Sequence, residues 1–296
     1  MRGGQLKTWL RQLRAPFLIL SVVLVLIGIA AARRDGFVNT WRSILLVLGV
    51  VLAHVSVNLF NEISDFHTGI DGDTRRTPFS GGSGMLQAGM TSVRAVTAAA
   101  YGALFAAAAI GFYFCVVSGW WIALFAVCGG LAIRLYTSHL TRWRIGEAIS
   151  GITLGSFVVL GTRYALSGAL TWEIALISIP PGILTSLLLF LNEFPDMEAD
   201  RKGGRRHLVI QFGRRRCSRI YVAGLAVVYG VILAAPFIAH VPGSILVALL
   251  TLPLAIRSGY LVLVHYDDMP RFIPALALNV AVVLLTDLLL AVGFFL

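Results

Sequence analysis

The sequence predicts an all-α polytopic membrane protein, and its composition and its apolar patterning both lead to this fold class. Of the 296 residues, 58% are hydrophobic and only 13% are charged. A soluble domain carries roughly 25% charged residues. Long uncharged apolar stretches recur from one end of the chain to the other, as expected for membrane-spanning helices of ~20 residues. Helices are the expected form because backbone groups in lipid must be satisfied within the segment.

Nine apolar stretches are predicted to span the membrane. They cover approximately residues 16–32, 43–64, 94–117, 119–137, 148–168, 172–192, 219–239, 243–265 and 271–295. No stretch has the composition of a separate soluble domain, so we expect a single transmembrane domain over residues 1–296. An odd number of spans places the two termini on opposite sides of the membrane.

The net charge of +10 is concentrated in a few short loops. Basic residues crowd into the N-terminal tail and the loops after the second, fourth and sixth spans. The alternate loops are almost free of them, apart from Arg33, Arg34 and Arg42 after the first span. The positive-inside rule therefore predicts a protein of the cytoplasmic membrane with its N-terminus inside and its C-terminus outside. This distribution indicates membrane topology and an anionic ligand, and it argues against nucleic acid as a partner.

Two acidic clusters, at the cytoplasmic ends of the second and sixth spans, look like copies of one motif. They read Asn61-Glu-Ile-Ser-Asp65-Phe-His-Thr-Gly-Ile-Asp71 and Asn192-Glu-Phe-Pro-Asp196-Met-Glu-Ala-Asp200. Each cluster is followed by basic residues. The recurrence predicts two pseudo-repeated four-helix halves plus a ninth helix around a central cavity, with the clusters meeting between the halves.

The two clusters are suited to a diphosphate held through a divalent metal. Residues four apart share one face of a helix, so each Asn points the same way as the Asp that follows it. Pro195 is expected to end or bend its helix, which would turn the acids after it toward the loop. Mg²⁺ prefers oxygen ligands and typically takes one or two carboxylates together with substrate phosphate oxygens. The expected ligands of magnesium diphosphate are Asn61, Asp65, Asp71, Asn192, Asp196 and Asp200.

The same residues carry a resemblance to a known family. The stretch from Asn192 to Leu208, with its Asp, Arg, Lys and Gly residues, closely resembles the second motif of the UbiA-type superfamily of intramembrane prenyltransferases. Leu135-Tyr136-Thr137 and Gly146-Glu147 resemble the signature of that family's fourth loop. The resemblance covers nearly the whole chain and implies nine helices and two aspartate-rich motifs that bind magnesium diphosphate. The expected diphosphate-binding residues are Arg75, Arg76, Arg134, Tyr136, Lys202 and Arg206.

The spacing of the first motif bears on the substrate. Family members that prenylate 4-hydroxybenzoate carry an acid four residues after Asp65, where this chain has Gly69, and here the acid arrives at Asp71. This order is more similar to the menaquinone-pathway branch, which prenylates 1,4-dihydroxy-2-naphthoate. That branch usually has Asn-Asp and Asn-Asn where this chain has Asn-Glu, at Glu62 and Glu193, so the acceptor stays open.

Several polar residues lie inside the apolar spans. His54, Asn58 and Arg257 are the candidates for the acceptor site or the cavity wall. For His54, a role in helix packing is favoured over a role as a ligand. An aromatic acceptor would, however, need a proton acceptor nearby. Arg163 and Asp287 fall at similar depth in the outer half of the membrane, and we expect them to pair.

The sequence thus predicts Mg²⁺-dependent transfer of a polyprenyl group from polyprenyl diphosphate to a small aromatic acceptor. The acceptor that the sequence favours is 1,4-dihydroxy-2-naphthoate or a related quinone precursor. Transfer to 4-hydroxybenzoate, homogentisate, a tetrapyrrole or a glycerol ether lipid stays open. A cation-coupled secondary transporter is the alternative from another class, but transporter acids typically lie near the membrane midplane. Membrane lipid is an expected partner, and no obligatory protein partner is evident.

Overall fold

The computed structural model describes residues 2–70, 77, 79–135 and 145–296, and every regular element within them is helical. Within these described residues, eight helical segments are long and apolar enough to cross a membrane by length and composition. They are Ala15–Arg34, Thr40–Thr68, Val93–Ser118, Gly146–Ser167, Trp172–Lys202, Leu208–Ile238, Gly243–His265 and Met269–Phe295. These segments confirm the all-helical fold class and match eight of the nine predicted spans.

A shorter apolar helix occupies the place of the remaining predicted span. This helix, α6 (Trp121–Leu135), reaches the edge of the described residues, which resume at Ile145. It is apolar along its length, with Arg134 as its one basic residue.

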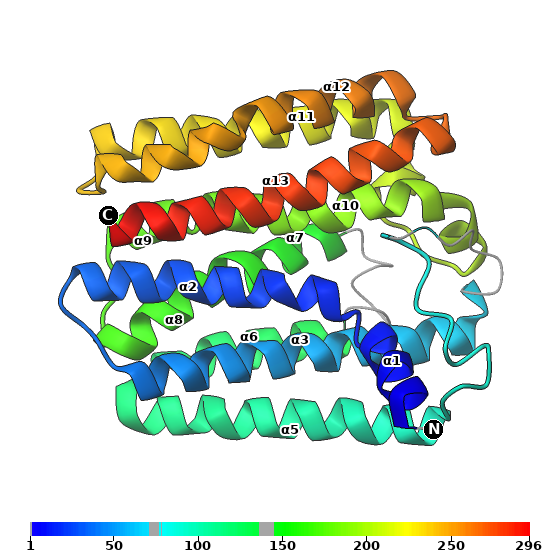
Figure 1. Ribbon diagram of the computed structural model, residues 1–296, viewed down its shortest axis with the longest axis horizontal. Coiled ribbons are helices and arrows are strands. Elements are labelled where there is room, and N and C mark those ends of the chain that lie inside the picture. The colour runs from blue at the N-terminus through cyan, green and yellow to red at the C-terminus, as the bar shows by residue number, and fades with distance from the viewer. Residues whose placement is uncertain (1, 71–76, 78, 136–144) are drawn as a thin grey trace.

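The long helices lie side by side along the long axis of the molecule, and the two termini lie toward opposite ends of that axis (Figure 1). The first elements are α1 (Arg2–Gln12), η1 (Ala15–Leu18), α2 (Ile19–Arg34), α3 (Thr40–Thr68) and α5 (Val93–Ser118). After α6 come α7 (Gly146–Ser150), η3 (Gly151–Ser156), α8 (Phe157–Ser167), α9 (Trp172–Ile177) and α10 (Ile179–Lys202). The last are α11 (Leu208–Ile238), η4 (Gly243–Thr251), α12 (Leu252–His265) and α13 (Met269–Phe295).

Helix α10 is the most enclosed of the long helices, and it packs against α11, α13, α7 and η3. Helix α3 packs mainly on α5, which lies at the edge of the bundle (Figure 1). Helix α5 carries exposed Phe105 and Val116. Such side chains are expected where a helix faces lipid, because lipid chains solvate them as well as a protein core does.

The helix that bears the first acidic motif has clear start and stop signals. The side chain of Asn39 accepts a hydrogen bond from the Arg42 backbone N–H at 3.0 Å and so caps the start of α3. Gly69 ends the helix in the left-handed conformation, with φ of 73°, which a residue with a side chain adopts less readily. Asp71 lies outside the described residues.

The sequence predicts that Pro195 ends or bends the helix that bears the second motif, and an end at this residue is not observed. Helix α10 continues through Pro195 to Lys202, and Asp200 therefore stands on its last turn. Proline removes one helical donor and crowds the preceding turn. The packing of α10 against its four neighbours offsets that local cost.

The prediction that Arg163 pairs with Asp287 is wrong. Arg163 on α8 donates from Nη2 to Oδ2 of Asp35, just after α2, at 2.5 Å. Asp287 on α13 is fully buried, and neither of its carboxylate oxygens has a hydrogen-bond partner among the described residues. Counting along the helices gives the depth of each residue but not the direction in which its helix faces, and α8 turns Arg163 toward the end of α2.

Candidate active site

The two acidic motifs occupy the C-terminal ends of α3 and α10, which lie at the same end of the bundle (Figure 1). Arg205, in the loop after α10, joins them. Its Nη1 atom donates to Oδ1 of Asp200 at 2.7 Å, and its Nη2 atom donates to Oδ1 of Asp65. Asp65 and Arg205 are 140 residues apart in the sequence. Two distant stretches of chain therefore converge on one guanidinium group.

Asp196 lies on α10 one turn before Asp200 and is half-buried. Its Oδ1 atom has no hydrogen-bond partner among the described residues. The charged groups around it are Asp200, Arg205 and Arg14. A sheltered carboxylate oxygen without a donor is well placed to accept a cation.

The other residues that the sequence predicted for the site lie at several places in the fold. Asn61 and Asn192 both line the cavity described below. Lys202 ends α10 and Arg206 lies in the loop that follows, and both are exposed. Arg134 is exposed near the end of α6. Four predicted residues lie outside the described part of the chain: Asp71, Arg75, Arg76 and Tyr136.

A cavity of about 620 Å³ opens beside the motifs and extends between α2, α3, α5, α6, α8 and α10. Its walls are predominantly apolar, with side chains such as Phe114, Phe125 and Phe157. Its charged and amide side chains, Arg14, Asn58, Asn61 and Asn192, lie toward the ends of α3 and α10 that bear the motifs. The cavity thus joins a polar mouth to a long hydrophobic interior.

The cavity is long enough for an isoprenoid chain. Along α3 its lining runs from Leu46 to Asn61, about 22 Å at the helical rise of about 1.5 Å per residue. Trp120, which follows α5, lies at the end away from the motifs. No described residue of α11, α12 or α13 is among its lining, so the cavity lies on one side of α10.

Two of the three predicted cavity residues line this cavity, and the third does not. His54 is buried in the wall, and its Nδ1 atom lies 2.8 Å from the Ser21 hydroxyl on α2. Asn58 donates to the Leu13 carbonyl at 3.0 Å. Arg257 is exposed on α12 and stacks over the ring of Tyr260 at 5.5 Å. Its assignment to the cavity is therefore corrected, because α12 packs outside the cavity wall.

The structure adds to the site three residues that the sequence analysis did not assign to it. Arg205 is one of several basic residues in its loop, and nothing in the sequence distinguishes it. Arg14 lines the cavity mouth with a left-handed backbone, φ 51° and ψ 46°, a conformation that non-glycine residues adopt mainly under constraint. Glu62 accepts hydrogen bonds from the backbone N–H and the hydroxyl of Ser83. The signal for Glu62 was its departure from the usual Asn-Asp pair.

The residues that the structure brings together fit a hard divalent cation. Their donor atoms are carboxylate and amide oxygens, which Mg²⁺ prefers. Asp196 keeps one oxygen without a partner, and the two Asn side chains reach the cavity mouth from opposite helices. Arg205 and the other basic residues nearby would compensate the charge of an anionic ligand.

The fold and the site together define a helical membrane protein with a carboxylate-rich mouth over a hydrophobic cavity. The model of the UbiA prenyltransferase family matches residues 21–291. The 1,4-dihydroxy-2-naphthoate octaprenyltransferase of Bacillus subtilis (strain 168) is 32% identical, over 71% of this chain and 67% of that protein.

Two solved structures share the fold. The apo structure of a UbiA homologue from Aeropyrum pernix K1 has a TM-score of 0.73, with 19% identity, and the match covers 94% of this chain and 96% of that one. A UbiA homologue from Archaeoglobus fulgidus bound to GPP and Mg²⁺ has a TM-score of 0.58 and 14% identity, covering 93% and 99%. This chain belongs to the UbiA family and is a prenyltransferase.

Proposed function

We propose that this prenyltransferase moves a polyprenyl group from polyprenyl diphosphate to 1,4-dihydroxy-2-naphthoate or a closely related quinone precursor. The observation that carries the proposal is the contact of Arg205 with both Asp65 and Asp200 beside an apolar cavity of about 620 Å³. The relative from Bacillus subtilis and the Gly69–Asp71 spacing both support a naphthoate acceptor.

The diphosphate head group would bind at the cavity mouth. The chain's candidates to hold Mg²⁺ there are Asn61, Asp65, Asp71, Asn192, Asp196 and Asp200. The Archaeoglobus fulgidus homologue with bound GPP and Mg²⁺ supports this assignment. When bound, Mg²⁺ would neutralise charge on the departing diphosphate. Further positive charge would come from Arg75, Arg76, Arg134, Lys202, Arg205 and Arg206, and Tyr136 would donate a hydrogen bond.

The apolar cavity would hold the isoprenoid tail and keep water away from the reacting carbon. The allylic C–O bond breaks, the electron pair leaves with diphosphate, and a ring carbon of the acceptor forms the new C–C bond. The aromatic ring is restored by loss of a proton, or of CO₂ where the attacked carbon carries the carboxylate. Enclosure matters because water would otherwise capture the allylic cation.

We also propose the finer topology. Helix α6 would complete nine spans, and the motif-bearing helices α3 and α10 would occupy equivalent places in two four-helix halves, with α13 as the ninth helix. Support comes from the two Asn-x-x-x-Asp motifs, which end these two helices. The basic loops favour a cytoplasmic site in the inner membrane, with the N-terminus inside and the C-terminus outside.

The test is transfer by membranes that contain the protein. Geranylgeranyl diphosphate is supplied with dihydroxynaphthoate, 4-hydroxybenzoate or homogentisate, and the products are identified by mass. We expect a prenylated naphthalene product that requires Mg²⁺ and is lost, by about 100-fold or more, in Asp196→Asn. Preferred prenylation of another acceptor would overturn the naphthoate assignment.

The matched control is Glu198→Gln on the same helix. Glu198 is exposed and pairs with Arg201 at 3.7 Å, so this substitution should leave transfer unchanged. Full Mg²⁺-dependent activity of a correctly inserted Asp196→Asn protein would overturn the assignment of the metal site.

A further inference from the structure

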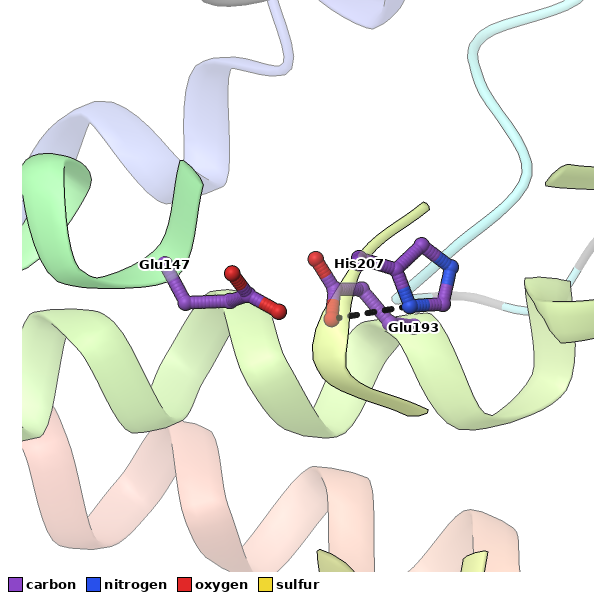
Figure 2. A group of neighbouring side chains, drawn as sticks. All are labelled: Glu147, Glu193 and His207. Carbon is purple, nitrogen blue, oxygen red and sulfur yellow. Dashed lines mark ion pairs between the residues drawn. The ribbon is translucent and has the colours of Figure 1, made fainter. Parts of the chain in front are cut away.

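A second group of side chains that can bind a metal ion lies next to the proposed diphosphate site but is separate from it. Glu147 in α7, Glu193 on α10 and His207 just before α11 each offer one donor atom, and these atoms lie within 4.8 Å of one another. Figure 2 shows the carboxylate of Glu193 between the carboxylate of Glu147 and the imidazole of His207. The three residues are 2%, 8% and 2% exposed, so the group is shielded from water.

The donor atoms that meet there have no other partners. Glu147 Oε1 accepts the Leu208 backbone N–H at 2.8 Å, but its Oε2 atom has no hydrogen-bond partner among the described residues. The same holds for Glu193 Oε2 and for His207 Nδ1. Buried polar atoms are almost always satisfied, so three buried donor atoms that face one another without a hydrogen-bond partner point to a shared ligand.

The separation of two of these atoms matches a shared metal better than a hydrogen bond. His207 Nδ1 lies 3.4 Å from Glu193 Oε2, without the geometry of a hydrogen bond. A tetrahedral ion with ligands at about 2.0–2.1 Å separates neighbouring donor atoms by about 3.3–3.4 Å. The third donor, from Glu147, lies within 4.8 Å of the other two.

The other ring nitrogen of His207 contacts a carboxylate of the second acidic motif. This nitrogen, Nε2, lies 3.2 Å from Oδ2 of Asp200. An ionised carboxylate has no proton to donate, so it can only accept a hydrogen bond. If Nε2 carries the proton, Nδ1 presents a lone pair toward Glu147 and Glu193. This carboxylate–histidine pairing is the usual support of a metal-bound imidazole, because it fixes both the tautomer and the ring orientation.

We propose that Glu147, Glu193 and His207 bind one divalent transition-metal ion, with Zn²⁺ as the best match, at a site distinct from the magnesium diphosphate site. One nitrogen and two carboxylate donors suit Zn²⁺, whereas Mg²⁺ favours oxygen donors. The ion ties α7, α10 and the start of α11 together. Through His207 it also fixes Asp200, which makes it a positioning site for the second acidic motif.

The experiment measures metal in the tag-free full chain in detergent, without any substrate. The protein is stripped with a chelator and then dialysed against Zn²⁺ in the presence of excess Mg²⁺, so that oxygen-only sites are filled by Mg²⁺. We expect about one Zn²⁺ per chain in the wild type and also in the double variant Asp65→Asn/Asp196→Asn. Glu193→Gln and His207→Gln should lose it, and Glu198→Gln should keep it.

Zinc-edge X-ray absorption of the wild type supplies a readout that needs no folded variant. We expect the scattering of one imidazole ligand, which the proposed diphosphate ligands cannot provide because none of them is a histidine. Absence of bound Zn²⁺, or of the imidazole signal, would overturn the proposal. So would zinc that is lost in Asp65→Asn/Asp196→Asn but kept in His207→Gln. Because the double variant is expected to be inactive, these results are independent of the proposed transfer reaction.

Discussion

At the scale of single residues, Arg205 links the two acidic motifs. A guanidinium carries donors on two nitrogens, so one side chain can contact Asp65 and Asp200 together. Both carboxylates are largely buried, and a buried carboxylate without a counter-charge is strongly unfavourable. Arg205 therefore holds the two motifs next to each other.

Substitution of Arg205 tests this bridging role. Lysine keeps the charge but offers one nitrogen, so it cannot contact both carboxylates in the same way. We expect kcat/KM for prenyl transfer to fall about 10-fold in Arg205→Lys and about 100-fold in Arg205→Ala. Steady-state assays in membranes measure both values. The control Arg271→Ala, an exposed arginine paired with Asp268 at 3.4 Å, should retain wild-type transfer. Equal activity of Arg205→Lys and wild type would contradict the need for two contacts.

At the scale of the elements, α10 packs closely against η3 through glycine residues. Gly151 and Gly155 in η3 are spaced four apart and face Gly182 on α10. A Cβ atom on Gly155 would lie 2.6 Å from the Gly182 Cα atom and 2.7 Å from the Pro181 carbonyl oxygen. Small residues at such a spacing let helix backbones approach closely in membrane proteins.

This contact predicts a stability effect in Gly155→Ala. The added methyl group cannot fit without separating α10 from η3, because the nearest atoms belong to the backbone. We expect a loss of about 1–3 kcal/mol, seen as a lower midpoint of thermal unfolding in detergent. Gly161→Ala is the matched control, since a Cβ there would meet Phe125 only at 3.6 Å. Equal unfolding midpoints for the two variants would show that the helix contact is not tight.

The elements also show what the sequence could and could not predict. Apolar length and composition located the spans, because each helix must satisfy its own backbone in lipid. The repeated Asn-x-x-x-Asp spacing located both motifs, since residues four apart share a helix face. The direction in which each helix faces depends on packing, so the partner of Arg163 and the exposure of Arg257 could not be predicted.

Loop residues were harder still to assign. Arg205 and His207 lie in a short segment between α10 and α11 whose path is set by contacts with distant helices. No periodicity applies to such a segment, and its several arginines look alike in the sequence. The meeting of Glu147, Glu193 and His207 likewise depends on three separate elements, so only the fold could reveal it.

At the scale of the whole molecule, the acidic motifs and the apolar interior of the cavity lie at different positions along the long axis of the helix bundle. The acidic motifs lie at one end of the bundle, where α3 and α10 end (Figure 1). The apolar cavity is lined along α3 from Leu46 to Asn61, which lies one turn before Asp65. A polyprenyl diphosphate has the same division, with a charged head and a long apolar tail. Helices α11 to α13 pack on the far side of α10 and add no described residue to the cavity wall.

The most direct test of the account is binding of a substrate analogue that cannot ionise, such as geranylgeranyl thiolodiphosphate, to the purified protein by calorimetry. We predict binding that requires Mg²⁺ and weakens at least about 10-fold in Asp65→Asn and in Asp196→Asn alike, because both motifs would hold one head group. Binding that is unchanged without Mg²⁺, or unaffected by either substitution, would contradict the claim that the two motifs act on one metal-bound diphosphate.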